Sequence, residues 1–245
     1  MASMPHLPSV LFEDNHIMAV DKPSGMLVQS DQTGDLDLLA HLKDFIKARD
    51  HKPGRVYLSA VHRLDRPVSG LVLLAKTSKA ASRLSGMFQE RTVRKLYLGL
   101  TRQRPNPERQ RLTHYLEKDA HKNRVHVYDR ARGQAKKAET SLQLLGESNR
   151  KSLLLLEPKT GRPHQLRAQL ARIDLPLLGD LRYGSSIETP DHSLSLHAWA
   201  LGLTHPVTRT WIVLRTPFPR HGFWHLFEDM QAEAMSYLPE SAHTT

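Results

Sequence analysis

The apolar residues of this chain are gathered in runs that have the length of β-strands. The runs Leu71–Ala75 and Leu153–Leu156 hold five and four apolar residues, whereas a membrane-spanning helix needs about 20 in succession. The first ten residues also lack the basic start and apolar stretch of a signal peptide. These features argue against a membrane-spanning helix, and they predict a soluble, cytoplasmic protein.

Helical spacing of apolar residues is confined to a few stretches between the expected strands. Helices are predicted over Asp35–Arg49, from a cap at Ser78 to Phe88, from Pro163 to Ile173, and over Phe223–Met235. Strands are predicted within Val10–Asp21, Val56–Val61, Leu71–Ala75, Lys95–Thr101, Thr113–Tyr128, Glu139–Leu145, Ser152–Pro158, Leu194–Thr204 and Thr210–Thr216. This pattern predicts an α+β fold with a mixed, largely antiparallel central sheet flanked by helices and loops. We expect one domain over residues 1–245, with its core at about 8–237.

The positive charge of the chain is concentrated in one segment, Arg91–Lys137. The whole chain has 35 Lys and Arg against 25 Asp and Glu, a net charge of +10. Residues 91–137 alone have 14 against 4, which gives the same +10. Such a surface favours a polyanionic partner such as structured RNA, because each neutralised phosphate releases counterions. A solvated basic segment without a partner is the alternative at this point.

The segment Val61–Lys76 combines charged side chains with a rigid support. Arg63 and Arg66 bracket the carboxylate of Asp65 in a polar loop between two apolar strands, and such loops commonly carry functional groups. Neighbouring cations favour the ionised carboxylate, which suits a nucleophile or a general base. A salt-bridged turn that merely anchors the loop is the structural alternative.

The same segment resembles the signature of the RluA family of RNA pseudouridine synthases. The resemblance rests on His62-Arg63-Leu64-Asp65-Arg66, Ser69-Gly70-Leu71 and Leu73-Leu74-Ala75-Lys76. Further stretches match in the family's order: Lys22-Pro23-Ser24-Gly25, Lys95-Leu96-Tyr97-Leu98, Thr160-Gly161-Arg162-Pro163-His164-Gln165-Leu166-Arg167, Leu178-Gly179-Asp180 with Tyr183-Gly184, and Leu196-His197-Ala198. The resemblance extends from about residue 8 to residue 220, and the ordered set of motifs makes it specific.

Resemblance to this family implies an isomerase that detaches uracil from its ribose in RNA, turns it, and rejoins it through carbon 5. The implied substrates are specific uridines in ribosomal RNA, transfer RNA or both. The family implies no cofactor and no metal, which agrees with the lack of cysteine, of a His-Glu-x-x-His helix and of a Gly-rich phosphate loop. The motifs leave open which RNA is the target, and whether the carboxylate attacks the sugar, attacks the base or removes a ribose proton.

By resemblance, Asp65 is the essential catalytic carboxylate. Tyr97 matches the tyrosine that packs against the target uracil, for which a phenol ring offers a flat face. Arg167 is expected to reach the Asp65 carboxylate and to hold it ionised and oriented. Arg63 matches the arginine that fills the space left by the flipped base, and Leu166 is expected beside the uracil.

Other cations are expected on the RNA side of the site. Arg66 and Lys95 are assigned to RNA binding, and Arg162 and His164 to phosphate contacts or to bracing of their loop. The remaining motif residues have more ordinary interpretations: Asp180 and Tyr183 as turn formers, His197, Trp199 and Trp211 as core residues, and Lys22 and Lys76 as ion-pair partners or RNA contacts.

Two features depart from the family's pattern. Pro67-Val68 stand where many members have an acidic residue followed by Thr, and we see no reason for this change to disable Asp65. A separate N-terminal RNA-binding domain is not expected, because the first core strand begins near Val10. We therefore expect the basic segment 91–137 to hold the RNA. We also expect a monomer, since no exposed apolar stripe is evident.

Two other functions compete with catalysis at uridine. A non-catalytic protein that binds and remodels RNA is the alternative on the same fold, but it would not need intact Asp65, Tyr97 and Arg167. A hydrolase would use Ser69 and His62 with Asp65, but these lie within eight residues and without a Gly-x-Ser-x-Gly motif.

Overall fold

The computed structural model describes residues 8–30, 35, 37–119 and 123–238, which form two units. Unit 1 comprises the described residues up to Val93 together with Ala200–Thr216, and unit 2 comprises those of Arg94–Trp199 and Pro217–Leu238. Residues 1–7 and 239–245, and His121 and Lys122 of the basic segment, lie outside the described residues. Within the described part of the chain, no helix is long and apolar enough to cross a membrane.

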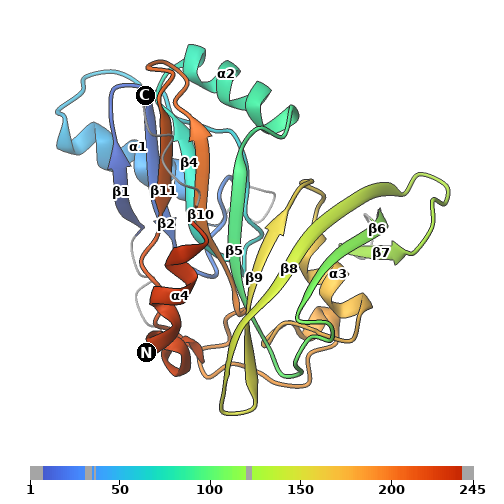
Figure 1. Ribbon diagram of the computed structural model, residues 1–245. Helices are drawn as coiled ribbons and strands as arrows, with labels where there is room; N and C mark the ends of the chain where they lie inside the picture. Colours follow the sequence, from blue (N-terminus) through green and yellow to red (C-terminus); the bar gives the residue numbers. More distant parts are fainter. Residues whose placement is uncertain (1–7, 31–34, 36, 120–122, 239–245) are drawn as a thin grey trace. The chain divides into compact units, whose positions relative to one another are not determined.

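Unit 1 is built on antiparallel strand pairs (Figure 1). Its elements are β1 (Ser9–Glu13), β2 (Ile17–Lys22), α1 (Leu38–Arg49), β3 (Ser59–Ala60), β4 (Ser69–Ala75), α2 (Ser78–Gln89), β11 (Trp211–Arg215) and the part of β10 (Leu196–Thr204) from Ala200 onward. Strand β2 pairs with β1 and with β4, and β10 pairs with β11. The turn between β1 and β2 is closed by Asp14, whose Oδ1 accepts the N–H groups of His16 and Ile17 at 2.7 Å each.

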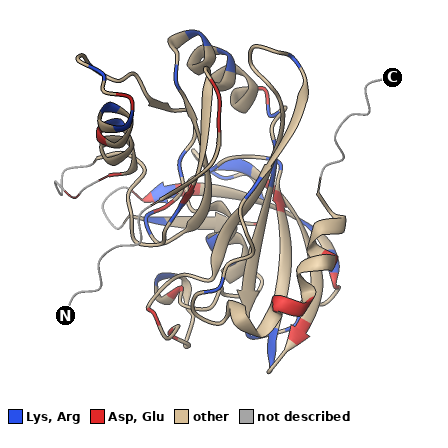
Figure 2. Ribbon diagram, turned by 90° about the vertical axis from the view of Figure 1, so that its left-hand side faces the viewer, with Lys and Arg blue, Asp and Glu red and all other residues tan. Residues whose placement is uncertain are grey.

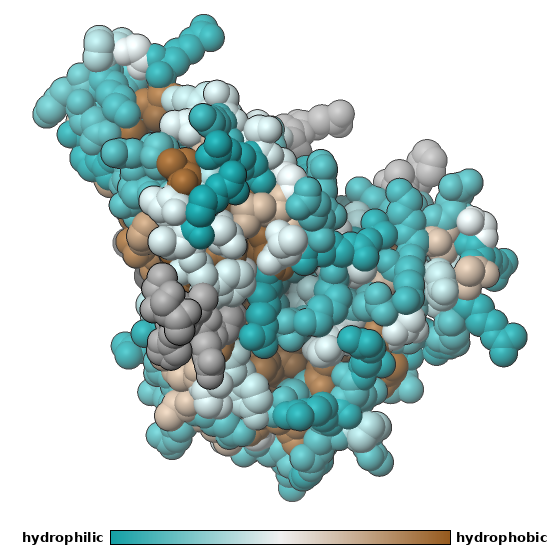
Figure 3. Space-filling view, turned by 45° about the horizontal axis from the view of Figure 1, so that its top comes forward, coloured by the Kyte–Doolittle hydropathy of each residue, from teal (hydrophilic) through white to brown (hydrophobic). Residues whose placement is uncertain are grey.

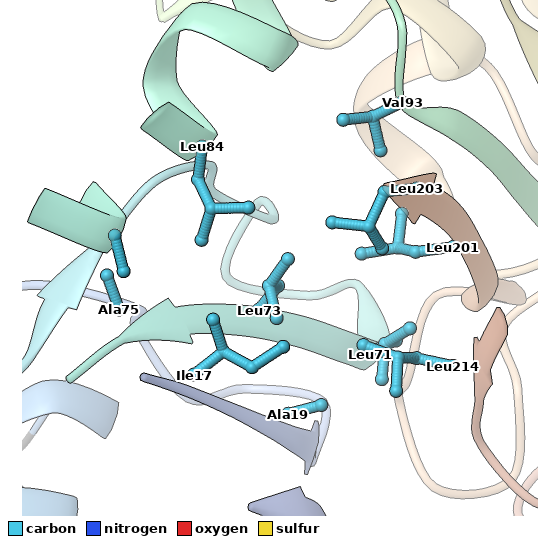
Figure 4. Packing of buried hydrophobic residues seen from close by; sticks show 11 residues of the cluster. Ile17, Ala19, Leu71, Leu73, Ala75, Leu84, Val93, Leu201, Leu203 and Leu214 are labelled. Atoms are coloured by element: carbon cyan, nitrogen blue, oxygen red, sulfur yellow. The ribbon is translucent and has the colours of Figure 1, made fainter. Parts of the chain in front are cut away.

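Strand β4 is buried at every position, which explains why its sequence is a continuous apolar run. Leu71, Leu73 and Ala75 lie in a cluster to which the neighbouring strands and helix α2 contribute (Figure 4). The other members drawn include Ile17, Ala19, Leu84, Val93, Leu201, Leu203 and Leu214. Each fully buried leucine contributes about 2 kcal/mol of hydrophobic free energy. The cluster therefore stabilises β4 and, with it, the position of the loop that precedes this strand.

Both helices of unit 1 begin at side-chain caps. Asp37 Oδ1 accepts the N–H of Ala40 at 2.9 Å, and Thr77 Oγ1 accepts the N–H of Ala80 at 3.2 Å. The cap of α2 is therefore Thr77, which has the extended backbone that a cap needs, and Ser78 is the first helical residue. The strand expected over 56–61 is reduced to β3, which pairs only with the last two residues of β4.

Unit 2 is an antiparallel sheet in the order β5-β9-β8-β6-β7. Its elements are β5 (Arg94–Thr101), β6 (Arg109–Asp119), β7 (Arg124–Tyr128), β8 (Lys136–Ser148), β9 (Lys151–Pro158), α3 (Gln165–Arg172), η1 (Leu181–Tyr183), η2 (Trp224–Met230) and α4 (Gln231–Ser236). The basic segment 91–137 thus supplies three strands and the start of a fourth. The two units together confirm an α+β fold with largely antiparallel pairing.

Strand β6 shows the alternation of a half-buried strand. Leu112, His114 and Leu116 are buried, whereas Arg111 and Thr113, on either side of Leu112, are exposed. On the buried side, Leu116 packs with Ala168 of α3, with Val125 and Ala138 of the adjoining strands, and with Tyr183. Helix α3 is therefore seated on the β6–β7 side of the sheet.

Two helices differ from the expectation. His164 has a left-handed backbone (φ 50°, ψ 21°), so α3 begins at Gln165 and Pro163 lies outside it. The helix expected over 223–235 is a 3₁₀ segment, η2, followed by α4, and Phe227 breaks the regular geometry with φ −127°. His197 and Trp199 are buried in β10, as expected for core residues.

Candidate active site

Asp65 lies in a turn that is anchored by apolar residues on both sides. Leu64 and Val68 are buried, and the Val68 N–H donates to the Asp65 carbonyl at 3.0 Å. The Asp65 side chain itself is half-buried. The loop thus presents one carboxylate from a backbone that its neighbours hold in place.

The Lys22-Pro23-Ser24-Gly25 loop is bonded to the same turn. The Gly25 N–H donates to the Arg66 carbonyl at 2.9 Å, and Ser24 Oγ donates to the Pro67 carbonyl at 2.7 Å. The Arg66 side chain returns a bond from Nε to the Gly25 carbonyl at 3.0 Å and pairs with Asp35 at 2.7 Å. Arg66 therefore braces two loops, and its assignment to RNA binding stays a prediction.

Lys22 is fully buried beneath this turn. Its Nζ donates to the carbonyls of Met26 at 2.8 Å, Pro23 at 2.9 Å and Arg66 at 3.3 Å. Burial lowers the pKa of Lys22 to about 7, and attraction to Asp65 acts in the opposite direction. The Lys-Pro motif thus supplies a structural cation next to the candidate carboxylate.

The two residues before Leu64 have different surroundings. His62 Nε2 accepts the N–H of Leu73 at 2.9 Å, and its ring stacks on Phe88 with centroids 4.8 Å apart. Arg63 is exposed, and among the residues that the structure describes its guanidinium has no carboxylate partner. Ser69 is buried in β4. His62 is therefore a structural acceptor, which speaks against the Ser69–His62 hydrolase, whereas Arg63 faces solvent.

Lys76, at the end of the signature, is a structural ion-pair partner. Its Nζ lies 2.6 Å from Glu13 Oε1 and donates to the Asp14 carbonyl. Arg49 donates to both oxygens of the same Glu13 carboxylate, at 2.6 and 2.9 Å. The hydrogen bond from Arg49 is the main cause that lowers the pKa of Glu13 to about 2. This cluster joins β1, α1 and the end of β4.

In unit 2, helix α3 is held to the sheet by two buried glutamines one turn apart. Gln165 Nε2 donates to the Glu139 carbonyl and to Thr140 Oγ1, both at 3.0 Å. Thr140 Oγ1 in turn donates to Gln169 Oε1 at 2.7 Å, and Gln169 Nε2 donates to the Ala138 carbonyl at 3.2 Å. Both amides thus form hydrogen bonds to β8, so the position of α3 is specified by polar contacts.

Arg167, on this helix, forms a buried ion pair with Asp180. Its Nε and Nη2 donate to the two carboxylate oxygens at 2.8 and 2.9 Å, and the guanidinium carbon lies 5.1 Å from the centre of the Tyr183 ring. Asp180 and Tyr183 are therefore more than turn formers. The Leu178-Gly179-Asp180 motif draws attention to Asp180, but nothing in the sequence indicates that Arg167 is its ion-pair partner. Contact of Arg167 with Asp65 stays a prediction.

The loop that precedes α3 is braced from several directions. His164 Nδ1 lies 2.8 Å from the Tyr183 hydroxyl, and Arg162 Nε donates to the Lys137 carbonyl at 3.1 Å. Gln165 Oε1 accepts the Arg162 N–H at 3.0 Å. Of the two roles expected for Arg162 and His164, the structure shows the bracing of the loop.

The remaining site residues of unit 2 lie on β5 and α3. Tyr97 is half-buried and stands opposite Leu156 of β9 in the ladder. Lys95 donates from Nζ to the Thr160 carbonyl at 3.1 Å, which ties β5 to the loop before α3. Leu166 is buried. The structure thus places Arg63, Asp65 and Arg66 in unit 1, and Lys95, Tyr97, Arg162, His164, Leu166 and Arg167 in unit 2.

Comparison with known proteins gives a consistent result. A family model described as RNA pseudouridylate synthase matches residues 16–172. The ribosomal large subunit pseudouridine synthase D of Nitrosomonas europaea is 32% identical, over 95% of this chain and 67% of that protein. The tRNA pseudouridine synthase C of Haemophilus ducreyi is 32% identical, over 81% and 86%. The solved human RNA pseudouridylate synthase domain containing 4 is 24% identical, covers 95% and 94%, and shares the fold with a TM-score of 0.73.

Proposed function

The chain belongs to the RNA pseudouridylate synthase family, and from this membership we propose that it converts specific uridines in RNA to pseudouridine. In this reaction the bond between ribose carbon 1 and uracil nitrogen 1 breaks, and a bond from the same ribose carbon to uracil carbon 5 forms. The product has the same composition as the substrate. The proposal extends the RluA-family resemblance, which the family match confirms, to this chain's own residues.

The observation that carries the proposal is the placement of Asp65. A half-buried carboxylate stands on a turn that is tied by backbone hydrogen bonds to the Lys22-Pro23-Ser24-Gly25 loop and underlain by the Lys22 ammonium. A reaction at a sugar needs a carboxylate that keeps its position while the base leaves and returns. A protein that only binds RNA has no need of this arrangement, so catalysis is favoured over RNA remodelling.

We assign the other roles by the same reasoning. The target base must leave the stack, at a cost of a few kcal/mol, and the exposed Arg63 is suited to occupy the vacated space because a guanidinium stacks and binds phosphate. Tyr97 is proposed to pack against the uracil, with Leu166 as an apolar neighbour. Arg167 is proposed to act on the Asp65 carboxylate during the reaction.

The basic segment 91–137 is proposed as the RNA-holding surface. Some of its cations are neutralised within the protein, since Arg94 pairs with Glu157 at 2.9 Å and Arg104 with Glu147 at 2.6 Å. The exposed cations that have no carboxylate partner among the described residues include Lys118, Arg130, Arg132 and Lys136. Lys118 lies in β6, Arg130 and Arg132 lie between β7 and β8, and Lys136 begins β8. Figure 2 marks all Lys and Arg positions in blue. This subset is suited to bind phosphates.

The RNA target, compartment and oligomeric state are parts of the same proposal. Relatives are named for large-subunit ribosomal RNA and for tRNA, so we propose a target in one or both classes and a cytoplasmic location. The face in Figure 3 is mostly hydrophilic, with apolar residues in small patches. For the oligomeric state we propose a monomer. Sedimentation equilibrium measures the mass directly, and a mass of about 28 kDa is expected from the chain mass of 27.9 kDa.

The experiment that tests the proposal is a map of pseudouridines in total RNA from cells with and without this gene. We expect one or a few positions in ribosomal RNA or tRNA to lose the modification and to regain it when the intact gene is restored. A gene carrying Asp65→Asn should not restore it. Identical maps with and without the gene would contradict the proposed function.

A further inference from the structure

We propose that Asp180 and Tyr183 are positioning residues that orient Arg167 for the reaction. The inference rests on the proposed function, in which Arg167 acts at the Asp65 carboxylate. Both Asp180 oxygens accept hydrogen bonds from Arg167, and the two side chains are 1% and 7% exposed. The Tyr183 ring lies against the guanidinium with its centre 5.1 Å from Cζ.

Asp180 and Tyr183 together restrain the Arg167 guanidinium, both within its plane and out of it. Two parallel hydrogen bonds to Asp180 fix the plane of the group and its rotation within that plane. The Tyr183 ring restrains motion out of the plane. Asp180 uses Nε and Nη2, so the nitrogen that these bonds do not use, Nη1, points in a defined direction. Desolvation makes a buried ion pair a poor source of stability, so orientation is the better explanation of this pair.

Asp180 is itself held by its own loop. Its N–H donates to the Leu177 carbonyl, and its carbonyl accepts the N–H groups of Tyr183 and Ser185, all at 3.0 Å. Gly179 has a left-handed backbone (φ +81°), which brings this loop close to the Ser193 carbonyl. The backbone that carries the Asp180 carboxylate is therefore held independently of the contact with Arg167.

Tyr183 joins this arrangement to two other elements. Its hydroxyl accepts the Val125 N–H of β7 at 2.9 Å and lies 2.8 Å from His164 Nδ1 at the start of α3. Arg124 of β7 lies over the same ring, with Cζ 5.6 Å from its centre. Tyr183 thus connects the basic β6–β7 pair with the helix that carries Arg167.

The same helix offers a matched control. Arg172 of α3 pairs with Asp129 at 2.5 Å, but both side chains of this pair are about half exposed. Asp129→Asn removes one carboxylate from an arginine of α3, as Asp180→Asn does. If Asp180 acts through Arg167, only Asp180→Asn changes catalysis.

The kinetic test measures single-turnover pseudouridine formation and RNA affinity with unmodified transcripts of ribosomal RNA and tRNAs. Misplacement of a group near the reaction costs about 100-fold in rate, so we expect Asp180→Asn to lower the rate about 100-fold while the Kd for RNA stays within about twofold. Tyr183→Phe keeps the ring and removes the hydroxyl, so a smaller loss of about tenfold is expected. Asp129→Asn should leave the single-turnover rate at saturating protein unchanged. Its RNA affinity is not part of the control, because Asp129 lies in the segment proposed to hold the RNA.

A double-variant cycle separates positioning from general damage. In an Arg167→Gln background, Asp180→Asn should lower the rate no further, because the residue through which it acts is absent. Full activity of Asp180→Asn, or an equal loss with and without Arg167, would overturn the inference. An Arg167→Gln protein with the normal rate would instead contradict the role given to Arg167 in the proposed function.

A measurement without RNA tests the geometry on its own. In the NMR spectrum, the Arg167 Nε–H should exchange slowly with water in the intact protein, because it is buried and bonded to Asp180. Asp180→Asn should accelerate this exchange at least about tenfold, whereas Asp129→Asn should not. Slow exchange that survives Asp180→Asn would refute the positioning role even if no RNA substrate were found.

Discussion

The buried ammonium of Lys22 donates a hydrogen bond to the backbone carbonyl of Arg66, the residue that follows Asp65 in the chain. The same nitrogen bonds the Met26 carbonyl at 2.8 Å, so one cation holds together the two loops that carry the most recognisable motifs of unit 1. Burial of this cation has a measurable consequence for the pH dependence of stability.

Lys22 should make the protein more stable as pH rises above neutrality. Burial lowers its folded-state pKa from 10.5 to about 7, so between these values the unfolded chain binds a proton that the folded chain does not. The free energy of unfolding then rises by up to about 1.4 kcal/mol per pH unit from this group. Urea unfolding at pH 7.5 and 9.5 measures the rise, which Lys22→Met should remove. An unchanged rise in that variant would rule out the buried cation as its source.

Arg63→Gln should lower activity without affecting the fold. The side chain is exposed and has no carboxylate partner among the described residues, and surface changes of this kind usually alter stability by less than about 0.5 kcal/mol. We expect a melting temperature within about 2 °C of that of the intact protein. We expect kcat/KM to be at least about tenfold lower, because no guanidinium then fills the place that the flipped base leaves in the RNA stack. Unchanged kcat/KM would remove Arg63 from the site.

The exposed cations of the basic segment should account for the salt dependence of RNA binding. We expect a combined Lys118, Arg130, Arg132 and Lys136 to Gln variant to bind the same RNA more weakly. Each phosphate contact contributes about 0.7 to 0.9 to the slope of log affinity against log salt, so the slope should fall by about 3. Filter binding at several salt concentrations gives both quantities.

A control with the same loss of charge uses cations outside that segment. Lys47, Lys79, Arg209 and Arg220 are exposed, and their joint replacement by Gln lowers the net charge equally. If this control weakens binding as much as the first variant does, general charge rather than the β6–β7 region holds the RNA.

Gly179→Ala should destabilise the protein strongly. The glycine has φ +81°, and a Cβ at this position would clash with the backbone carbonyl oxygen of Ser193. The strained backbone conformation alone costs about 1 to 3 kcal/mol, and the clash adds to it. Chemical denaturation should therefore show a loss of at least about 2 kcal/mol. Gly86→Ala is the control, because a Cβ there meets nothing within 4 Å and the change should be neutral or stabilising.

The strands and the Asp65 loop could be predicted from the sequence because their signals are local. Leu71–Ala75 is a continuous apolar run, and β4 is buried on both faces. The arginines that bracket Asp65 stand next to it in the chain. The length of β3 could not be predicted, because Val56–Val61 has apolar residues but only Ser59 and Ala60 find partners on β4.

The surroundings of Arg167 were not accessible from the sequence for a different reason. Asp180 lies 13 residues away and is brought to the guanidinium by the path of an irregular loop, which no periodicity encodes. The start of α3 differs from the prediction. Pro163 suits a first helical position, whereas His164 adopts a left-handed backbone and its ring contacts the Tyr183 hydroxyl. Both differences arise from contacts between residues that are distant in the chain.

The most direct test of the account compares the intact protein with Asp65→Asn on the same unmodified RNA. The substitution keeps the size of the side chain and removes its charge and its nucleophilic oxygen. We predict equal RNA affinity, and pseudouridine formation that falls by at least about 1,000-fold, as expected when a covalent or general-base carboxylate is lost. Pseudouridine formed by Asp65→Asn at the rate of the intact protein would contradict the central claim.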